Sequence, residues 1–170
     1  MLKKISLKLG IKRSLKKDNT KRAFIPFEKA SKIGIMVSNR QHYNLIQEFA
    51  QNLKKKNKQV TTLFFGKPNT FPQKKEDNIL LSTKEINAVG KIKNPEAEKF
   101  IKSEFDFLFY LNTSPTLLLE SILLASNAKC RVGFYDERNI PYCDMFFPVE
   151  DKNNIKKALK TVEKYIQTLK

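Results

Sequence analysis

The 170-residue sequence has little of what metal sites, cofactor sites and hydrolytic centres are built from. It contains no tryptophan, five glycines, two cysteines and one histidine. Cys130 and Cys143 are far apart in sequence, and the lone His42 cannot complete a Cys/His zinc set. Neither GxGxxG nor GxxxxGK[ST] is present, so the backbone lacks the glycines that wrap a pyrophosphate, and no GxSxG elbow supplies a nucleophile. We therefore expect a protein that is not an enzyme, with no catalytic residue, cofactor or metal.

Long apolar runs are also missing. No stretch of 18 apolar residues exists, which predicts that the chain has no transmembrane helix. The N-terminus is charged but has neither a continuous apolar segment nor a small-residue cleavage site, so it does not read as a secretory signal. Isolated cysteines fit a reducing compartment, and we expect a cytoplasmic protein.

Acidic residues are scarce relative to basic ones. The chain has 33 Lys and Arg against 17 Asp and Glu, a net charge of +16, which attracts polyanions such as nucleic acid or an anionic membrane surface. A lysine-rich composition can also reflect the base composition of a genome. Residues 1–22, however, hold nine basic side chains and one acidic, a net +8, and the other 148 residues, with 24 basic and 16 acidic, carry the remaining +8. The nine candidate polyanion contacts are Lys3, Lys4, Lys8, Lys12, Arg13, Lys16, Lys17, Lys21 and Arg22.

This basic N-terminal arm, residues 1–22, has the spacing of a helix. Leu2, Ile5 and Leu9 fall on one stripe. Gly10 costs a helix about 1 kcal/mol, which favours a break there, and like charges repel along the segment. We expect the arm to be poorly ordered alone and to order on a polyanion. The stripe could instead pack on the body, or lie on a membrane, although it is narrow and lacks Trp and Phe.

The rest of the chain alternates short apolar runs with amphipathic segments. Strands are predicted at 32–38, 59–66, 79–82, 105–112, 128–134 and 143–149, and helices at 40–57, 95–103, 115–127 and 151–169. Pro95 suits the first turn of its helix, and Ser114 is a candidate cap before Pro115. The order predicts an α/β fold: a single three-layer Rossmann-like domain over residues 30–170, with a mainly parallel sheet of about five or six strands. The arm lies outside this domain.

Small polar residues follow three of the predicted strands. In open α/β sheets ligands bind beyond the carboxyl ends of the strands. The residues predicted to line such a crevice are Ser38, Asn39, Arg40, Asn112, Thr113, Ser114, Tyr135 and Asp136. The adjacent carboxylates of Asp136 and Glu137 are best explained by a solvated turn or a salt bridge to Arg138, and Cys130 by an inert core thiol.

Several segments resemble known families. The Lys/Arg-rich start, KIGIMVS, FDFLFYLN, ASNAKCRVGFYDE and YCDMFF, in that order, resemble a family of short, basic, uncharacterised bacterial proteins with a domain of unknown function. Residues 105–134 are also similar to a strand-helix-strand unit in the N-terminal domain of heptosyltransferase-type glycosyltransferases. Those enzymes have two Rossmann-like domains and bind the nucleotide sugar mainly through the second. This chain has room for only one such domain and would lack the donor site. The resemblance therefore implies that the sheet has been reused as a binding scaffold.

These observations favour a non-enzymatic RNA-binding protein. We expect it to be ribosome-associated or a ribosome assembly factor, with the arm on rRNA phosphates and the body docked on RNA or on ribosomal proteins. The alternative is a small-molecule or nucleotide-sugar binding domain, a degenerate half of a glycosyltransferase. Binding to an anionic membrane surface is a third and less favoured possibility.

Overall fold

The computed structural model describes residues 2–17, 22–38, 42–67, 76–87, 91–114, 116–151 and 154–169. Its strands are β1 Lys32–Val37, β2 Gln59–Phe65, β3 Asn78–Leu81, β4 Phe107–Tyr110, β5 Arg131–Phe134 and β6 Met145–Phe147. Its α-helices are α1 Leu2–Lys17, α2 Tyr43–Lys55, α3 Pro95–Lys102, α4 Leu117–Ala125 and α5 Ile155–Ile166. Short 3-10 turns occupy Phe27–Lys29 (η1), Thr83–Glu85 (η4) and Glu137–Asn139 (η5).

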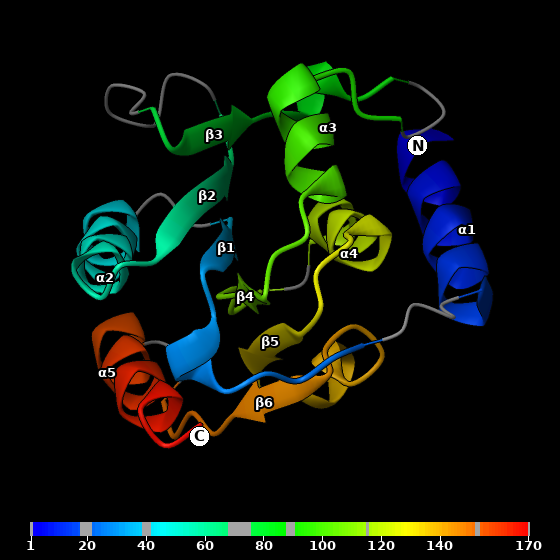
Figure 1. The fold of residues 1–170 in the computed structure, drawn as a ribbon. Helices are drawn as coiled ribbons and strands as arrows, with labels where there is room; N and C mark the ends of the chain where they lie inside the picture. The colour runs from blue at the N-terminus through cyan, green and yellow to red at the C-terminus, as the bar shows by residue number, and fades with distance from the viewer. Residues whose placement is uncertain are drawn as a thin grey trace.

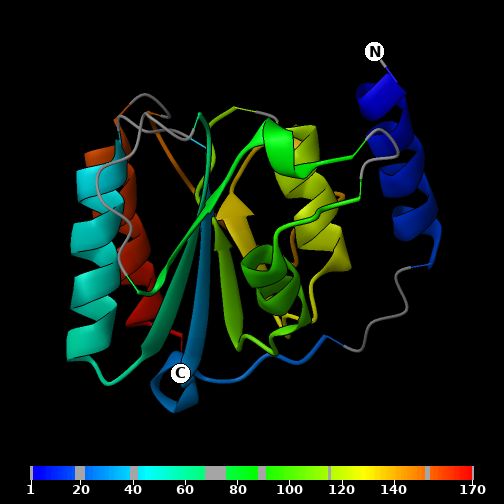
Figure 2. The same cartoon turned by 90° about the horizontal axis from the view of Figure 1, so that it is seen from above.

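The strands form one parallel six-stranded sheet in the order β3-β2-β1-β4-β5-β6. Helices α2 and α5 cover one face of the sheet and α3 and α4 the other (Figure 1; Figure 2). This is the strand order of the Rossmann fold, in which the chain reverses its winding between the first and fourth strands. The predicted three-layer α/β architecture is therefore confirmed. No helix among the described residues is long and apolar enough to cross a membrane.

Strand β4 shows why the apolar runs become central strands. All four of its residues are buried, and successive side chains enter opposite cores. Phe107 and Phe109 pack in the cluster beneath α2 and α5, whereas Leu108 and Tyr110 pack beneath α3 and α4. A strand covered on both faces needs apolar side chains at every position, which produces a continuous run rather than an alternating pattern.

One of the two predicted helix starts is confirmed and the other is wrong. Pro95 is the first residue of α3, and the Asn94 side chain accepts a hydrogen bond from the Ala97 amide at 3.0 Å. The prediction that Ser114 caps the next helix is wrong, because α4 begins at Leu117 with Thr116 in the capping position. Ser114 lies three residues before the first helical residue, too far along the chain to cap it.

Residues 2–17 form helix α1, which packs on the body, as in the alternative stated above, rather than staying poorly ordered, and it packs through a different row than expected. It continues through Gly10, where the expected break does not occur. Ile5 and Leu9, from the predicted packing stripe, are 48% and 51% exposed, whereas Leu7 and Ile11 are buried and the helix contacts α4. Both rows have helical spacing, so the sequence pattern could not tell which row meets the body. Helix α1 thus lies outside the layer that α3 and α4 form (Figure 2).

Candidate functional site

The basic side chains that the structure describes on α1 are all exposed. Lys4, Lys8, Lys12 and Lys16 recur every four residues and are exposed, as is Arg13. At 1.5 Å per residue this row is about 18 Å long. The helix contains no acidic residue, so nothing within it neutralises the row. The side chains of Lys3 and Lys17 and the whole of Lys21 lie outside the described residues.

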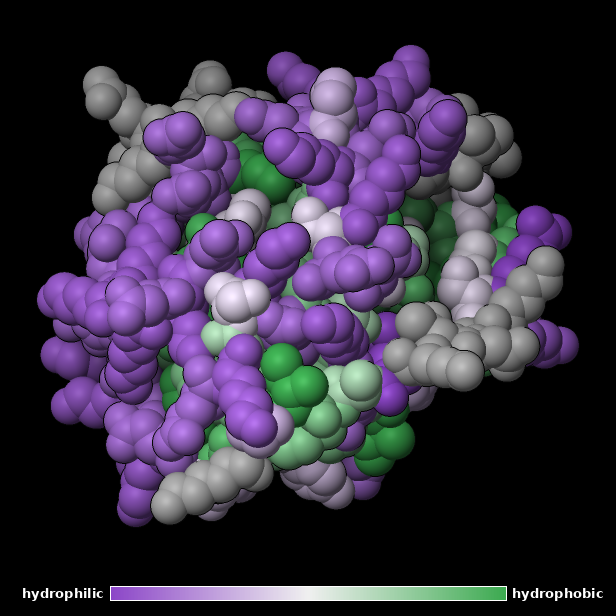
Figure 3. All heavy atoms as spheres, viewed as in Figure 1, coloured by the Kyte–Doolittle hydropathy of each residue, from purple (hydrophilic) through white to green (hydrophobic). Residues whose placement is uncertain are grey.

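The outward face of α1 is also partly apolar. Leu9 lies on the side of the helix opposite Leu7 and Ile11, and Ile5 lies on the preceding turn beside it. Exposed Lys12 and Arg13 lie on the two sides of this outward row. In Figure 3 the surface over α2 and α5 is almost uniformly hydrophilic, whereas hydrophilic and hydrophobic residues mix at the α1 edge. Helix α1 therefore has two apolar sides, one against α4 and one toward solvent.

Arg22 does not belong to this basic face. Its Nη1 donates a hydrogen bond to the Ala128 carbonyl oxygen at 2.6 Å, and its Nε lies 3.6 Å from Oδ1 of Asp144. The next residue, Ala23, donates its backbone N–H to the Lys129 carbonyl oxygen at 3.1 Å. With 17% of its side chain exposed, Arg22 is a poor phosphate contact in this arrangement. The prediction that Arg22 contacts a polyanion stays untested, and in this structure its guanidinium group is engaged within the body.

A crevice lies beyond the carboxyl ends of β1 and β4, at the switch point where the winding of the sheet reverses. It is held together by Asn112, which lies two residues past the end of β4 and is 5% exposed. Its Oδ1 accepts a hydrogen bond from the Ser38 hydroxyl, at the end of β1, at 2.5 Å. Its Nδ2 donates to the Tyr110 hydroxyl and to Oγ1 of Thr116, both at 3.1 Å, and to the Ser114 carbonyl oxygen. Asn112 thus joins two neighbouring strand ends and fixes the loop that leads into α4.

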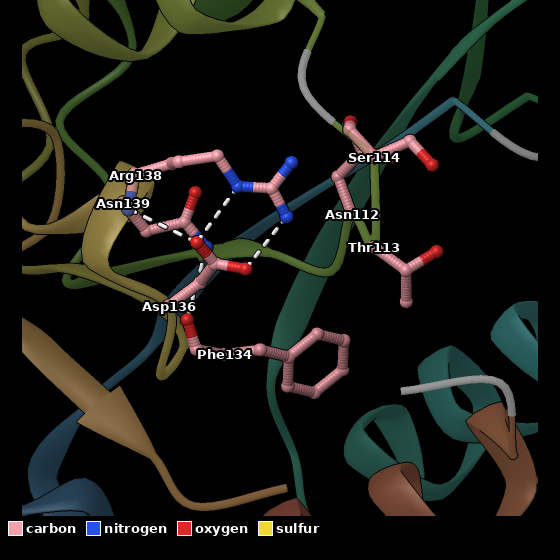
Figure 4. Close-up of a pocket in the computed structure, with 7 residues that line it drawn as sticks. All are labelled: Asn112, Thr113, Ser114, Phe134, Asp136, Arg138 and Asn139. Atoms are coloured by element: carbon pink, nitrogen blue, oxygen red, sulfur yellow. Dashed lines mark hydrogen bonds and ion pairs between the residues drawn. The ribbon is translucent and has the colours of Figure 1, made fainter. Parts of the chain in front are cut away.

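The opposite wall of the crevice is the turn η5, which follows β5. The Asp136 carboxylate accepts hydrogen bonds from Nε and Nη2 of Arg138 at 2.8 and 2.7 Å (Figure 4). Asn139 donates to the Phe134 carbonyl oxygen at 2.9 Å and holds the turn against its strand. The expected salt bridge between Asp136 and Arg138 is confirmed. Between the two walls lies a small concavity that is partly open to solvent and is lined by Asn112, Thr113, Ser114, Phe134, Asp136, Arg138 and Asn139.

The structure brings together some of the predicted crevice residues and separates others. Ser38 bonds to Asn112 and so supports the crevice from β1. Tyr135 is 56% exposed and sets its ring edge-on to Phe146, at 6.1 Å between centroids, rather than lining the concavity. Asn39 and Arg40 lie outside the described residues. No sequence signal indicates that Arg138 and Asn139 line the concavity, because they lie in a turn whose direction the pattern does not encode.

A buried acid, Glu120, lies near this wall in the first turn of α4. Burial raises the pKa of its carboxyl group, and a hydrogen bond from the Thr116 backbone and the charge of Arg138 partly oppose this effect. Sequence reasoning missed Glu120 because it sits inside the apolar run LLLESILL.

The two cysteines are free and buried. Burial raises the pKa of each thiol to about 12, which makes both inert toward nucleophilic chemistry. Among the described residues no group of three or more His, Cys, Asp or Glu side chains could hold a metal ion.

The parallel sheet, its strand order and the polar crevice define a Rossmann-like α/β protein with a basic helix docked on its outer layer. The chain belongs to the family of unknown function DUF6913, whose model matches residues 3–169. No curated protein and no solved structure matches the chain. The resemblance to an uncharacterised family is confirmed by this match, whereas the resemblance to heptosyltransferases gains no support.

Proposed function

We propose that the protein is a non-enzymatic RNA-binding protein whose contact surface is the basic outward face of α1. The observation that carries the proposal is the row Lys4, Lys8, Lys12 and Lys16, exposed on a helix without acids and docked on α4 through Leu7 and Ile11. A docked helix holds its cations in one line before binding, which reduces the entropy lost on association. The row supports contact with a phosphate backbone.

Contacts of this kind would position the protein on an RNA backbone rather than recognise a base sequence. The row presents ammonium groups, and phosphate contacts of this kind give affinity and register without base specificity. The exposed side chains of α1 include no aromatic ring on which a base could stack. A partner recognised in this way must be defined by its shape, and a ribosomal particle or assembly intermediate in the cytoplasm is the partner we propose. The body would then dock on adjacent RNA or on ribosomal proteins.

The salt dependence follows from the number of cations. If the row and Arg13 engage five phosphates of a duplex, the association constant should fall about 500-fold between 50 and 200 mM salt. The sharpest test compares two triple variants with the same spacing. K8Q/K12Q/K16Q removes charge from α1, and K156Q/K160Q/K164Q removes the same charge from three exposed positions of α5.

Binding to an rRNA duplex fragment is measured by fluorescence anisotropy, and co-sedimentation with ribosomal particles is measured in parallel. We expect the α1 triple to lose most of its affinity and the α5 triple to lose far less. Equal losses in both triples would mean that overall charge, rather than α1, drives the binding. Full-length protein that neither binds the duplex nor sediments with ribosomal particles at 50 mM salt would overturn the proposal.

A second candidate function is binding to an anionic membrane surface. Ile5 and Leu9 are about half exposed and are flanked by cations, which is an arrangement that also suits an anionic membrane surface. The variant I5S/L9S separates the two functions because it keeps every charge. If RNA is the partner, I5S/L9S should bind the duplex like the wild type. If the membrane is the partner, it should fail to pellet with phosphatidylserine vesicles that the wild type binds.

A further inference from the structure

The crevice at the switch point has an uneven supply of hydrogen-bonding groups. Its acceptors are engaged within the cluster: both carboxylate oxygens of Asp136 by Arg138, and the amide oxygen of Asn112 by Ser38. The guanidinium group uses Nε and Nη2 for Asp136, and a guanidinium carries five N–H donors and no acceptor. The groups left to meet a ligand are therefore mainly donors.

The donors converge on one space. In Figure 4 the guanidinium group of Arg138 extends from η5 toward Asn112 and Ser114 on the opposite wall. The side chain of Arg138 is 57% exposed, Ser114 is exposed and Thr113 is half-buried. The hydroxyl groups of Thr113 and Ser114 can donate to the same ligand as the guanidinium N–H groups.

Both walls are fixed before a ligand arrives. Paired hydrogen bonds to Asp136 set the plane of the Arg138 guanidinium, and its backbone N–H also donates to Asp136, at 3.0 Å. On the other wall the buried Asn112 holds the loop to β1 through Ser38. Preorganised donors of this kind favour a rigid, acceptor-rich group, and guanidinium ions pair with phosphates through two parallel bonds.

We propose that this crevice binds the phosphoryl group of a small phosphorylated sugar. A phosphoryl group supplies acceptors in every direction, which matches a site whose own acceptors are engaged. The concavity is small and partly open to solvent, so it can take a phosphoryl group with a single sugar at its mouth but not a dinucleotide. The proposal is independent of RNA binding by α1.

The test uses ribose 5-phosphate, inorganic phosphate and ribose as probes on the ¹⁵N-labelled full chain. We expect ribose 5-phosphate to shift the backbone amides of Thr113 and Ser114 and the Nε–H signal of Arg138 in a saturable way. Inorganic phosphate should shift the same signals with weaker affinity, and ribose should leave them unchanged. Absence of saturation by ribose 5-phosphate up to about 10 mM, which excludes a binding free energy beyond about −3 kcal/mol, would overturn the proposal.

Two variants and a control locate the site. R138Q should weaken ribose 5-phosphate binding at least about tenfold, as expected for the loss of a charged hydrogen bond. T113V removes one hydroxyl and should weaken it less, while R13Q removes another exposed guanidinium, from α1, and should leave it unchanged. Equal weakening by R13Q and R138Q, or none by R138Q, would contradict the proposal. R138Q should bind the rRNA duplex normally, so a failure of the crevice proposal is distinguishable from a failure of RNA binding.

Discussion

Arg22 donates a hydrogen bond from Nη1 to the carbonyl oxygen of Ala128, 106 residues further along the chain, at 2.6 Å. This bond ties the segment that follows α1 to the chain that leads into β5. Asp144, just before β6, faces the same guanidinium and also pairs with Arg131 at 3.4 Å. A basic residue that the charge pattern assigns to the arm is therefore part of the body.

This placement predicts that Arg22 contributes to the stability of the fold and not to RNA binding. R22Q should lower the free energy of unfolding by about 1.5–3 kcal/mol, the usual value of a hydrogen bond to a charged group. Its affinity for an rRNA duplex should stay within about twofold of the wild type. K12Q, on the exposed row, should show the reverse. Urea unfolding and anisotropy on the same preparations measure both quantities, and a stable R22Q that binds RNA as poorly as K12Q would contradict the assignment.

Leu7 and Ile11 lead to a prediction about how helix α1 is attached to the body. They are the buried residues among the α1 side chains that the structure describes, and their loss should free the helix while the sheet stays folded. L7A/I11A should therefore lose most amide protection in residues 4–14, measured by hydrogen exchange, with little change in the exchange of β1 and β4. The matched control is I5A/L9A, which shortens side chains that face solvent and should keep the protection. Equal loss in both variants would mean that α1 is not docked through Leu7 and Ile11.

The structure also indicates which parts of the chain a pattern can predict. The apolar runs around Phe107–Tyr110 and the amphipathic segment Ile155–Ile166 predict their elements because burial on one or two faces dictates the spacing. The outward direction of Ile5 and Leu9 could not be predicted, since two rows of α1 share helical spacing. Arg138 and Arg22 act through partners that lie opposite them only in the folded chain. Directions and long-range partners depend on tertiary contacts, which periodicity does not record.

The cysteines give a prediction about reactivity. Burial raises the pKa of Cys130 and of Cys143 to about 12. At pH 8 this leaves roughly one thiol in ten thousand as the reactive thiolate, and the folded chain blocks access to it as well. A thiol-specific disulfide reagent should therefore modify neither cysteine in the native protein and both in denaturant. Rapid labelling of one thiol under native conditions would show that its side of the sheet opens.

Asp106 gives a prediction about pH. It precedes β4 and is 5% exposed. Its Oδ2 accepts hydrogen bonds from the backbone N–H groups of Ser31 and Lys32 at 2.7 and 3.0 Å, and its Oδ1 lies 2.7 Å from Nζ of Lys129. Burial alone would raise the pKa of this carboxyl group, but the hydrogen bonds from Lys129, Lys32 and Ser31 outweigh burial and lower the pKa from 3.8 to about 2.

A carboxylate with a lowered pKa stabilises the fold when it is ionised. Its contribution, about 2 kcal/mol, is fully present above pH 4 and is lost as the pH falls through 2. D106N should therefore be less stable than the wild type by about that amount at pH 7, and its unfolding free energy should depend less on pH between 4 and 2. E137Q removes an exposed carboxylate and should change the free energy at pH 7 by less than about 0.5 kcal/mol. Urea unfolding across this pH range is the measurement, and an unchanged pH slope in D106N would mean that Asp106 does not anchor β1 to β4 through its charge.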